Sequence, residues 1–321
     1  MDNKKIRVGI VRGLLYYKYT AMWEEFLKQL GCETLISPTT NKEILSRGSS
    51  VAIDESCLAV KIFLGHVDCI KDKVDYILIP RIESLIKDEL LCTKFMGLPD
   101  VVRNSFDSVN VLDFNISLKE GISPKHAFLK LGKKFSSNPF KIRNAYKKAC
   151  LAQTKFERDM EKGIIPKEIL NEGVLNNKGS LKIAVLGHPY NVYDEFIGIP
   201  IIKKLNKLNA EIKTVEIVEP ELARELSKNI SEKLYWTYNK EILGAAQYYL
   251  NKGIDGIIFL ISFPCGPDSL SIELAIQKIK SRVPIMVLIL DELQAEAGLQ
   301  TRLESFVDIL KMQKGIDYAA N

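Results

Sequence analysis

The sequence lacks most of the short motifs by which an enzyme class is recognised. None of its strand-like segments is followed by G-x-G-x-x-G, G-x-x-x-x-G-K-S/T or G-x-S-x-G. The chain therefore lacks the local motifs of nucleotide hydrolases and of serine hydrolases. Any use of ATP energy would need a partner protein that hydrolyses ATP. There is also no C-x-x-C pair, and the 3 histidines are far apart, so spacing alone indicates neither a zinc ribbon nor a ferredoxin-type cluster loop.

Long apolar runs are missing as well. No stretch approaches the roughly 20 apolar residues of a membrane span, and residues 1–5 lead into a strand-like segment without the features of a signal peptide. We therefore expect a cytoplasmic protein with no membrane partner. The 45 basic and 40 acidic residues give a net charge of +5, and the lysines are scattered, which favours a solvated surface over nucleic-acid binding. A basic docking face for an acidic partner or a CoA-type ligand stays open.

The segments that are present indicate an α/β protein of two domains. The 321 residues contain a β-α-β pattern at each end, opening at residues 6–11 and 181–188, with a helical stretch between them. We predict two Rossmann-like, flavodoxin-like domains with parallel sheets, at residues 1–116 and 180–321. A helical connector at residues 117–179 would join them, leaving a cleft between the two domains.

The most informative stretch is an apolar run at residues 257–262, which is typical of a strand buried on both faces. It leads to Cys265. Gly266 and Pro267 predict a turn, after which Asp268 or Ser269 would cap a helix. Backbone N–H groups and the helix dipole favour a thiolate where a strand ends and a helix begins, so the position suits a metal ligand or a nucleophile. A buried structural cysteine is the alternative.

Two further cysteines, Cys57 and Cys92, also lie near predicted strands or helices. Residues 51–57 predict a short strand that runs into an acidic turn at Cys57, which repeats the placement of Cys265. Residues 81–84 predict a loop after a buried strand at residues 76–80, and Cys92 lies in the next irregular stretch. Because ligands bind outside the carboxyl ends of parallel strands, we expect Cys57, this loop and Cys92 at one edge of the sheet.

Together these motifs resemble the cluster-binding subunits of 2-hydroxyacyl-CoA dehydratases and benzoyl-CoA reductases, most closely the acyl-CoA dehydratase activase-related branch. The resemblance covers nearly the whole chain. The segments that carry it are residues 13–19 with Trp23 and Phe26, 54–57 with 60–61 and 65–67, 80–81, 92–95 with 97–99, 190–194, 263–269 and 301–306.

The resemblance implies that Cys57, Cys92 and Cys265 hold an iron–sulfur cluster in the cleft. The cluster would be a cubane (4Fe-4S) or half of a double-cubane (8Fe-9S) cluster. It would accept low-potential electrons from an ATP-hydrolysing iron–sulfur activator protein, and the chain would reduce a small molecule or dehydrate a 2-hydroxyacyl-CoA at an open iron. A dimer, with itself or with a different subunit, is also implied. The alternatives are an accessory cluster-carrying electron relay or maturation protein, and a metal-free ligand-binding protein.

Four more residues are candidates for the site. Glu55 could act as a base or merely cap the following helix, and His66 could donate a hydrogen bond to cluster or substrate or be a packing residue. Lys61 could temper the cluster's negative charge, and Arg81 could bind an anionic group. The remaining cysteines, Cys32, Cys69 and Cys150, lie in or at the end of amphipathic helices and are expected to fill the core.

Overall fold

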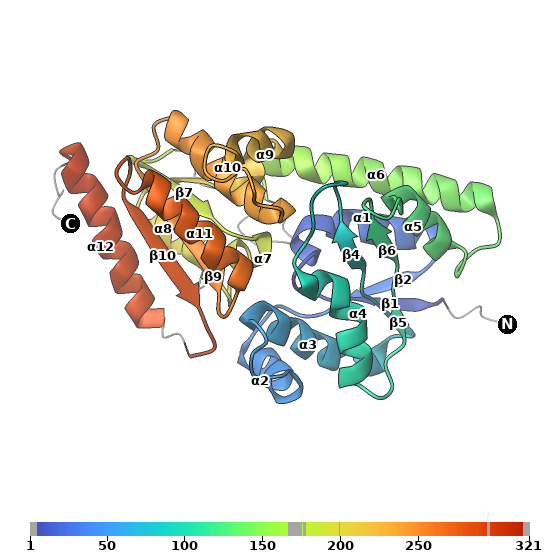
Figure 1. Ribbon diagram of the computed structural model, residues 1–321. Helices are drawn as coiled ribbons and strands as arrows, with labels where there is room; N and C mark the ends of the chain where they lie inside the picture. Colours follow the sequence, from blue (N-terminus) through green and yellow to red (C-terminus); the bar gives the residue numbers. More distant parts are fainter. Residues whose placement is uncertain (1–4, 166–174, 176–177, 199, 294–295, 317–321) are drawn as a thin grey trace. The chain divides into compact units, whose positions relative to one another are not determined.

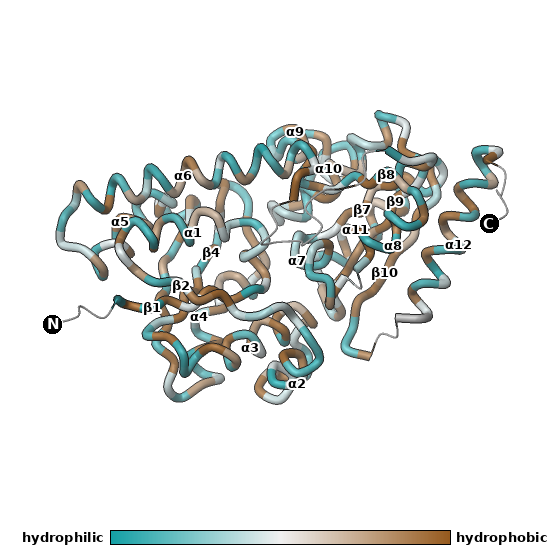
Figure 2. The backbone as a smooth tube through the Cα atoms, turned by 180° about the vertical axis from the view of Figure 1, so that it is seen from behind, coloured by the Kyte–Doolittle hydropathy of each residue, from teal (hydrophilic) through white to brown (hydrophobic). Residues whose placement is uncertain are grey.

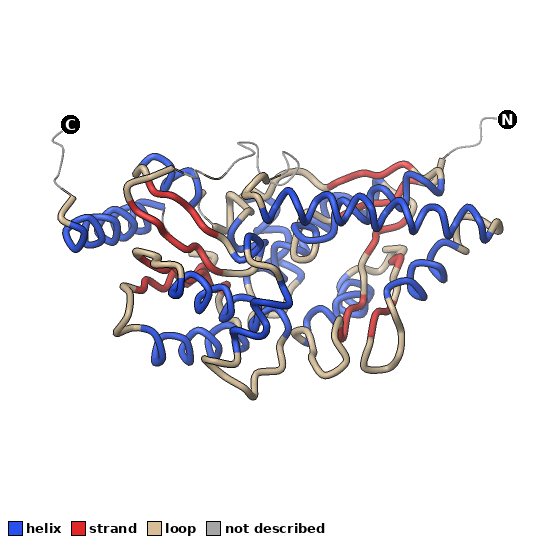
Figure 3. Tube along the Cα trace, turned by 90° about the horizontal axis from the view of Figure 1, so that it is seen from above, coloured by secondary structure: helices blue, strands red, loops and turns tan. Residues whose placement is uncertain are grey.

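The chain forms two compact units, each with its own parallel sheet. The computed structural model describes residues 5–165, 175, 178–198, 200–293 and 296–316. Unit 1 comprises Met1–Arg158 and Tyr235–Thr237, and unit 2 comprises Asp159–Leu234 and Tyr238–Asn321. Helices cover both faces of each sheet (Figure 1; in Figure 3 the helices are blue and the strands red). The predicted α/β class with two Rossmann-like sheets is confirmed, whereas the three-part division at residues 116 and 179 stays a prediction.

In its described part, unit 1 is built on four parallel strands in the order β2-β1-β3-β5. The strands are β1 (Arg7–Ile10), β2 (Glu33–Ile36), β3 (Tyr76–Leu78) and β5 (Val111–Leu112). The chain passes from β1 to β2 on one side of β1, and then from β2 to β3 on the other side of β1. The strand order therefore reverses between β1 and β3. Open α/β sheets bind ligands at the carboxyl edge of such a switch point.

A second pair of strands continues this sheet. β4 (Arg81–Ser84) pairs with β6 (Asn115–Ser117), and the Arg81 N–H donates to the Phe114 carbonyl over 2.9 Å. β4 and β6 thus prolong the pairing of β3 with β5. The prediction of a loop at residues 81–84 is therefore wrong, because these backbone groups find partners in the neighbouring strand.

The helices of unit 1 lie on both faces of its sheet. They are α1 (Tyr16–Leu30), α2 (Lys42–Val51), α3 (Leu58–Ile70), α4 (Thr93–Ser105), α5 (Pro124–Gly132) and α6 (Pro139–Glu161). α1, α5 and α6 share one face, where the rings of Phe26 and Phe128 are 4.9 Å apart and Lys141 Nζ donates to the Leu30 carbonyl over 3.2 Å. α3 and α4 cover the other face (Figure 1).

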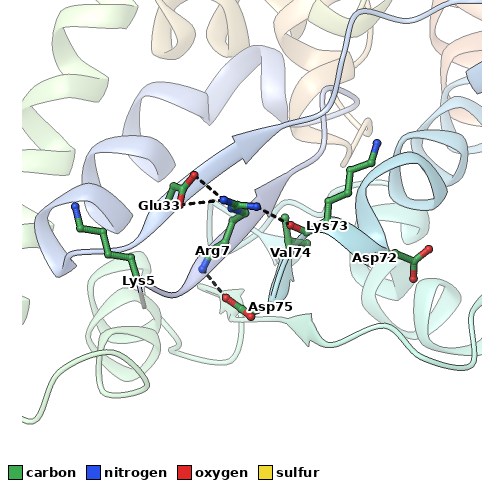
Figure 4. Close-up of a pocket in the computed structure, with 7 residues that line it drawn as sticks. All are labelled: Lys5, Arg7, Glu33, Asp72, Lys73, Val74 and Asp75. Carbon is green, nitrogen blue, oxygen red and sulfur yellow. Dashed lines mark hydrogen bonds and ion pairs between the residues drawn. The ribbon is translucent and has the colours of Figure 1, made fainter. Parts of the chain in front are cut away.

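At the amino ends of the strands, an ion pair and a backbone-to-side-chain hydrogen bond join neighbouring strands of unit 1. Arg7 Nη2 lies 3.2 Å from Glu33 Oε1, and the Arg7 N–H donates to Asp75 Oδ2 over 2.7 Å (Figure 4). Asp72 and Lys73 also line the pocket in that figure, and the Lys73 carbonyl accepts a hydrogen bond from Arg7 Nη1 over 3.4 Å. This edge ties β1 to β2 and to the start of β3.

The sheet of unit 2 repeats the topology of unit 1. Its described strands are parallel in the order β10-β9-β7-β8 and comprise β7 (Leu181–Leu186), β8 (Ala210–Lys213), β9 (Gly256–Ser262) and β10 (Ile285–Leu290). When the strands are numbered within each four-stranded sheet, both sheets have the order second-first-third-fourth. All seven residues of β9 are buried, as the apolar run predicts. The switch point of unit 2 lies between β7 and β9.

Six helices of the described part surround this second sheet. They are α7 (Pro189–Val192), α8 (Ile201–Lys207), α9 (Pro220–Ser227), α10 (Thr237–Asn251), α11 (Gly266–Ile279) and α12 (Glu296–Lys314). Lys204 Nζ of α8 donates to Gln300 Oε1 of α12 over 3.0 Å, which joins these two helices. Figure 2 shows hydrophobic colour along β9 and alternating colours along α6 and α12. None of the helices in the described ranges is long and apolar enough to span a bilayer.

The prediction of a strand at residues 51–57 is wrong. α2 continues to Val51, and the chain then turns without a strand before α3 begins at Leu58. The close packing of α2 against α3 explains the helix, since a Cβ atom on Gly48 would lie 1.7 Å from the Lys61 carbonyl oxygen. Cys57 therefore follows a turn, and only its position before a helix matches that of Cys265.

Candidate functional site

Three of the six cysteines are N-cap residues of helices. Cys57 precedes α3, Cys92 precedes α4 and Cys265 precedes α11, each with non-helical backbone. Among the described residues, none of these side chains forms a capping hydrogen bond with its helix, and none of the six cysteines forms a disulfide. The three side chains are half-buried. The structure thus separates these cysteines from Cys32, Cys69 and Cys150.

The topology puts each of these N-caps at the carboxyl edge of its own sheet. α3 leads into β3, α4 into β5 and α11 into β10. A helix that joins two parallel strands runs antiparallel to them, so its first residue lies where the preceding strand ends. Each of these cysteines thus lies at the positive end of a helix dipole, a position that in general favours a thiolate. Thiolates are the protein ligands that iron–sulfur clusters prefer.

The candidate residues near Cys57 differ in exposure. Glu55 is exposed in the turn before the helix, whereas Lys61, one turn into α3, is buried. The Cys57 carbonyl accepts hydrogen bonds from the N–H groups of Val60 and Lys61, over 2.9 and 3.1 Å. Because Gly48 and Gly65 let α2 and α3 approach closely, the start of α3 is fixed by packing as well as by these bonds.

Arg81 connects the strand before Cys92 with the helix after it. Its Nη1 donates to the Met96 carbonyl over 2.7 Å, and its Nη2 lies 2.7 Å from Asp100 Oδ1. The hydrogen bond from Arg81, opposed by some burial, holds the pKa of Asp100 below its usual range. Met96 and Asp100 both belong to α4, so the guanidinium orients the helix that begins after Cys92.

His66 lies inside unit 1, fully buried in α3. Its Nε2 is 3.0 Å from Thr40 Oγ1, and its Nδ1 has no hydrogen-bond partner among the described residues. Burial, and secondarily the positive charge of Arg12, lower the pKa of His66 to about 3. The imidazole is therefore neutral at physiological pH.

A buried polar cluster occupies the carboxyl edge of unit 2. His188 follows β7, and its Nε2 lies 2.9 Å from Asp268 Oδ1 in the first turn of α11. Asn239 Nδ2 of α10 donates to the same oxygen over 2.8 Å, while Asp268 Oδ2 has no partner among the described residues. Burial raises the pKa of Asp268, but His188, Asn239 and the thiol of Cys265 outweigh it, and the pKa stays below its usual range.

Aromatic and amide side chains hold this cluster in place. The Tyr190 ring stacks on the imidazole of His188 with centroids 5.0 Å apart. Asn191 Oδ1 accepts from Ser262 Oγ over 2.6 Å, which ties the loop after β7 to the end of β9. Cys265 thus stands at a switch point whose two sides are joined by buried hydrogen bonds.

The other three cysteines lie in different environments. Cys32 follows the end of α1, and burial raises its pKa to about 11. Cys69 lies in the last turn of α3. Cys150 lies inside α6 and forms a hydrogen bond with the Tyr146 hydroxyl.

The structure changes the sequence interpretation at α11. The helix begins at Gly266, directly after Cys265, so the prediction that Asp268 or Ser269 caps it after a turn is wrong. Asp268 instead bonds to His188, a residue that the sequence analysis did not single out. Its signal was present, because His188 follows a buried strand in the same manner as the cysteine.

The three cysteines proposed as ligands do not form one metal-binding group among the described residues. Among the described residues, no group of three or more His, Cys, Asp or Glu side chains is placed to hold a metal ion. Cys57 and Cys92 belong to unit 1 and Cys265 belongs to unit 2. The set of three, together with the roles of Glu55 and His66, therefore stays a prediction.

Comparison with known proteins identifies the family. Residues 7–218 match the family described as the CoA enzyme activase uncharacterised domain (DUF2229). The match covers more than half of the chain, which therefore belongs to this family. No curated protein sequence matches the chain.

Two solved structures show distant similarity to this chain. The periplasmic zinc-binding protein TroA from Treponema pallidum has 9% identity and a TM-score of 0.27, over 95% of this chain and 99% of that one. A putative phosphosugar isomerase from Silicibacter pomeroyi DSS-3 has 10% identity and a TM-score of 0.21, over 98% and 88%. At these TM-scores neither similarity carries an argument about function.

Proposed function

We propose that this chain is an iron–sulfur protein in which Cys57, Cys92 and Cys265 bind the cluster. The observation that supports it most directly is that these three cysteines, and not the other three, are helix N-caps. Three protein thiolates would leave one iron of a cubane open to another ligand. When bound, such a cluster would supply single-electron transfer at low potential.

The residues around the thiolates have defined tasks in this proposal. The N-termini of α3, α4 and α11 stabilise the three thiolates. Lys61 adds positive charge one turn beyond Cys57, and Arg81 holds α4 so that Cys92 keeps its orientation. The pair of His188 and Asp268 fixes the first turn of α11 behind Cys265. Neutral His66 remains proposed as a hydrogen-bond donor toward the cluster or the substrate, and exposed Glu55 remains proposed as a base.

The family description supports a connection with a CoA-dependent enzyme system. We propose that an ATP-hydrolysing iron–sulfur activator protein donates the electron, since the chain has no nucleotide-hydrolysis motif of its own. The reaction would be reduction of a small molecule or dehydration of a 2-hydroxyacyl-CoA. A cytoplasmic location and a dimer, with itself or with a different subunit, complete the proposal.

An accessory role is the second candidate, because the family is described as an activase rather than as the dehydratase itself. In that case the chain would carry or relay electrons without a substrate of its own. Electron paramagnetic resonance distinguishes the two: a substrate-binding cluster changes its spectrum when a 2-hydroxyacyl-CoA or a small ligand such as cyanide is added, whereas a relay cluster does not.

The first test is strictly anaerobic purification followed by iron and sulfide assays and an electronic spectrum. The proposal predicts about four irons and four sulfides per chain for a cubane, with the broad visible absorption of thiolate-bound iron. A colourless protein that takes up no iron during chemical reconstitution would contradict it and would favour a metal-free ligand-binding protein.

A further inference from the structure

A pocket outside the candidate site lies beside α5 in unit 1. It measures about 400 Å³ and is bounded by α5 and the turn after it on one side, and by the chain that follows β5 on the other. This size is within the range of small-molecule sites. The residues used below are Asp113, Phe114, His126, Lys130, Leu131 and Lys134, all of which line it.

The positive charge of the lysines in this pocket is not balanced by acidic side chains of the lining. Lys130 lies one turn after His126 on the same face of α5, and Lys134 lies in the following turn, so their side chains approach the same space. Neither ammonium group pairs with an acidic side chain in the part of the chain that the structure describes. The one acid of the lining, Asp113, is already engaged, with its Oδ2 2.8 Å from Arg103 Nη2.

The pocket in Figure 4 provides the contrast. There the Arg7 guanidinium pairs with Glu33, and the three basic residues of the lining, Lys5, Arg7 and Lys73, are matched by three acidic ones, Glu33, Asp72 and Asp75. Beside α5 the only acid is neutralised by an arginine, and two lysines remain. A pocket of this kind attracts an anion.

Apolar side chains form the floor of the pocket. Phe114 and Leu131 are both buried, and the Phe114 ring packs against Phe128 with centroids 4.8 Å apart. The floor is thus anchored in the core between the sheet and α5. These two apolar side chains and the two lysines therefore line the same pocket.

We propose that this pocket binds a ligand that carries phosphate groups next to an apolar or aromatic group. Lys130 and Lys134 bind the phosphates, and the surface formed by Phe114 and Leu131 holds the apolar part. The proposal is independent of the cluster, since none of these residues is a proposed ligand of iron.

Isothermal titration of the full chain with ADP, inorganic pyrophosphate and adenosine tests the proposal. We expect ADP to bind saturably, pyrophosphate to bind more weakly, and adenosine not to bind detectably by itself. Raising the salt from about 50 to about 500 mM should weaken ADP binding. If adenosine binds as tightly as ADP, the phosphate site is refuted, and if pyrophosphate does, the apolar contact is refuted.

Matched lysine variants complete the experiment. Lys130→Ala and Lys134→Ala should each weaken ADP binding by about tenfold or more, because each removes a charge-assisted contact. Lys125→Ala and Lys133→Ala remove exposed charges from the same segment outside the pocket lining and should change binding less than about threefold. Absence of saturable ADP binding, or equal losses in the two pairs, would overturn the proposal.

Discussion

Nε2 of His188 lies 2.9 Å from Oδ1 of Asp268, and both side chains are buried at the carboxyl edge of the second sheet. The pair joins the loop after β7 to the first turn of α11, and Asn239 adds a bond from α10. A buried carboxylate is stable only when hydrogen-bond donors surround it. The first turn of α11, and with it the position of Cys265, therefore depends on this pair.

Replacing His188 by phenylalanine should destabilise the protein by about 3 kcal/mol, because the buried carboxylate of Asp268 loses a donor. Phenylalanine keeps the ring that stacks on Tyr190, so the loss of packing is small. Urea unfolding followed by circular dichroism measures the free energy. The same replacement at exposed His126 should change it by less than about 0.5 kcal/mol. Equal stability of the two variants would refute this role of His188.

The contact between α2 and α3 depends on two glycines. A Cβ atom at Gly65 would lie 1.8 Å from the Ile44 carbonyl oxygen, and one at Gly48 would lie 1.7 Å from that of Lys61. Gly48→Ala and Gly65→Ala should each cost about 2–3 kcal/mol in unfolding free energy, because the helices must move apart.

Gly97→Ala in α4 is the matched control for these two changes. No atom outside its own chain neighbourhood lies within 4 Å of the added Cβ, so we expect a neutral effect or a stabilisation of up to about 1 kcal/mol. If Gly48→Ala and Gly65→Ala are as stable as Gly97→Ala, the close approach of α2 and α3 is contradicted.

The stability of unit 1 should depend on pH through His66. Its pKa is about 3 in the folded chain, against an ordinary value of 6.5. Between these pH values the unfolded chain binds a proton at His66 that the folded chain does not. The free energy of unfolding therefore has its full value above pH 6.5 and decreases as the pH falls toward 3. The slope is at most about 1.4 kcal/mol per pH unit.

The measurement is the free energy of unfolding of the wild type and of His66→Gln, by urea titration at several pH values between 4 and 7. Other titrating groups are common to both proteins, so the difference isolates His66. We expect the wild type to lose stability more steeply than the variant as the pH falls. Parallel curves would mean that His66 accepts a proton in the folded protein at its ordinary pKa.

Alkylation should distinguish Cys32 from the helix N-cap cysteines in the metal-free protein. Burial raises the pKa of Cys32 to about 11, which leaves little thiolate at neutral pH. Because the remaining thiolate is more nucleophilic, we expect about tenfold slower reaction than for an ordinary cysteine. Cys57, Cys92 and Cys265 should react faster, as measured by mass spectrometry after timed exposure to iodoacetamide. Fastest reaction at Cys32 would contradict the assignment.

The sequence predicts the sheets better than the site. The run at residues 257–262 is apolar throughout because β9 is buried on both faces, and this made the strand and the place of Cys265 predictable. A strand is wrongly predicted at residues 51–57 because their β-branched residues suit a strand. In the structure, the contact of Gly48 with α3 keeps Val51 helical. Tertiary packing decided the local structure there.

The spacing of residues along the sequence does not predict the polar cluster of unit 2. His188 and Asp268 are 80 positions apart, and only the parallel arrangement of β7 and β9 brings their loops together. The strand order of each sheet was equally hidden, because the same β-α-β pattern allows several orders. Strand ends that carry polar residues were nevertheless the right places to search.

The most direct test of the cluster proposal is the iron content of single cysteine variants after anaerobic purification. Cys57→Ala, Cys92→Ala and Cys265→Ala should each lose most of the iron and the visible absorption, while their circular dichroism stays that of the wild type. Cys32→Ala, Cys69→Ala and Cys150→Ala should keep about four irons per chain, as in the wild type. Iron that persists in all three N-cap variants, or that disappears equally in all six, would contradict the assignment.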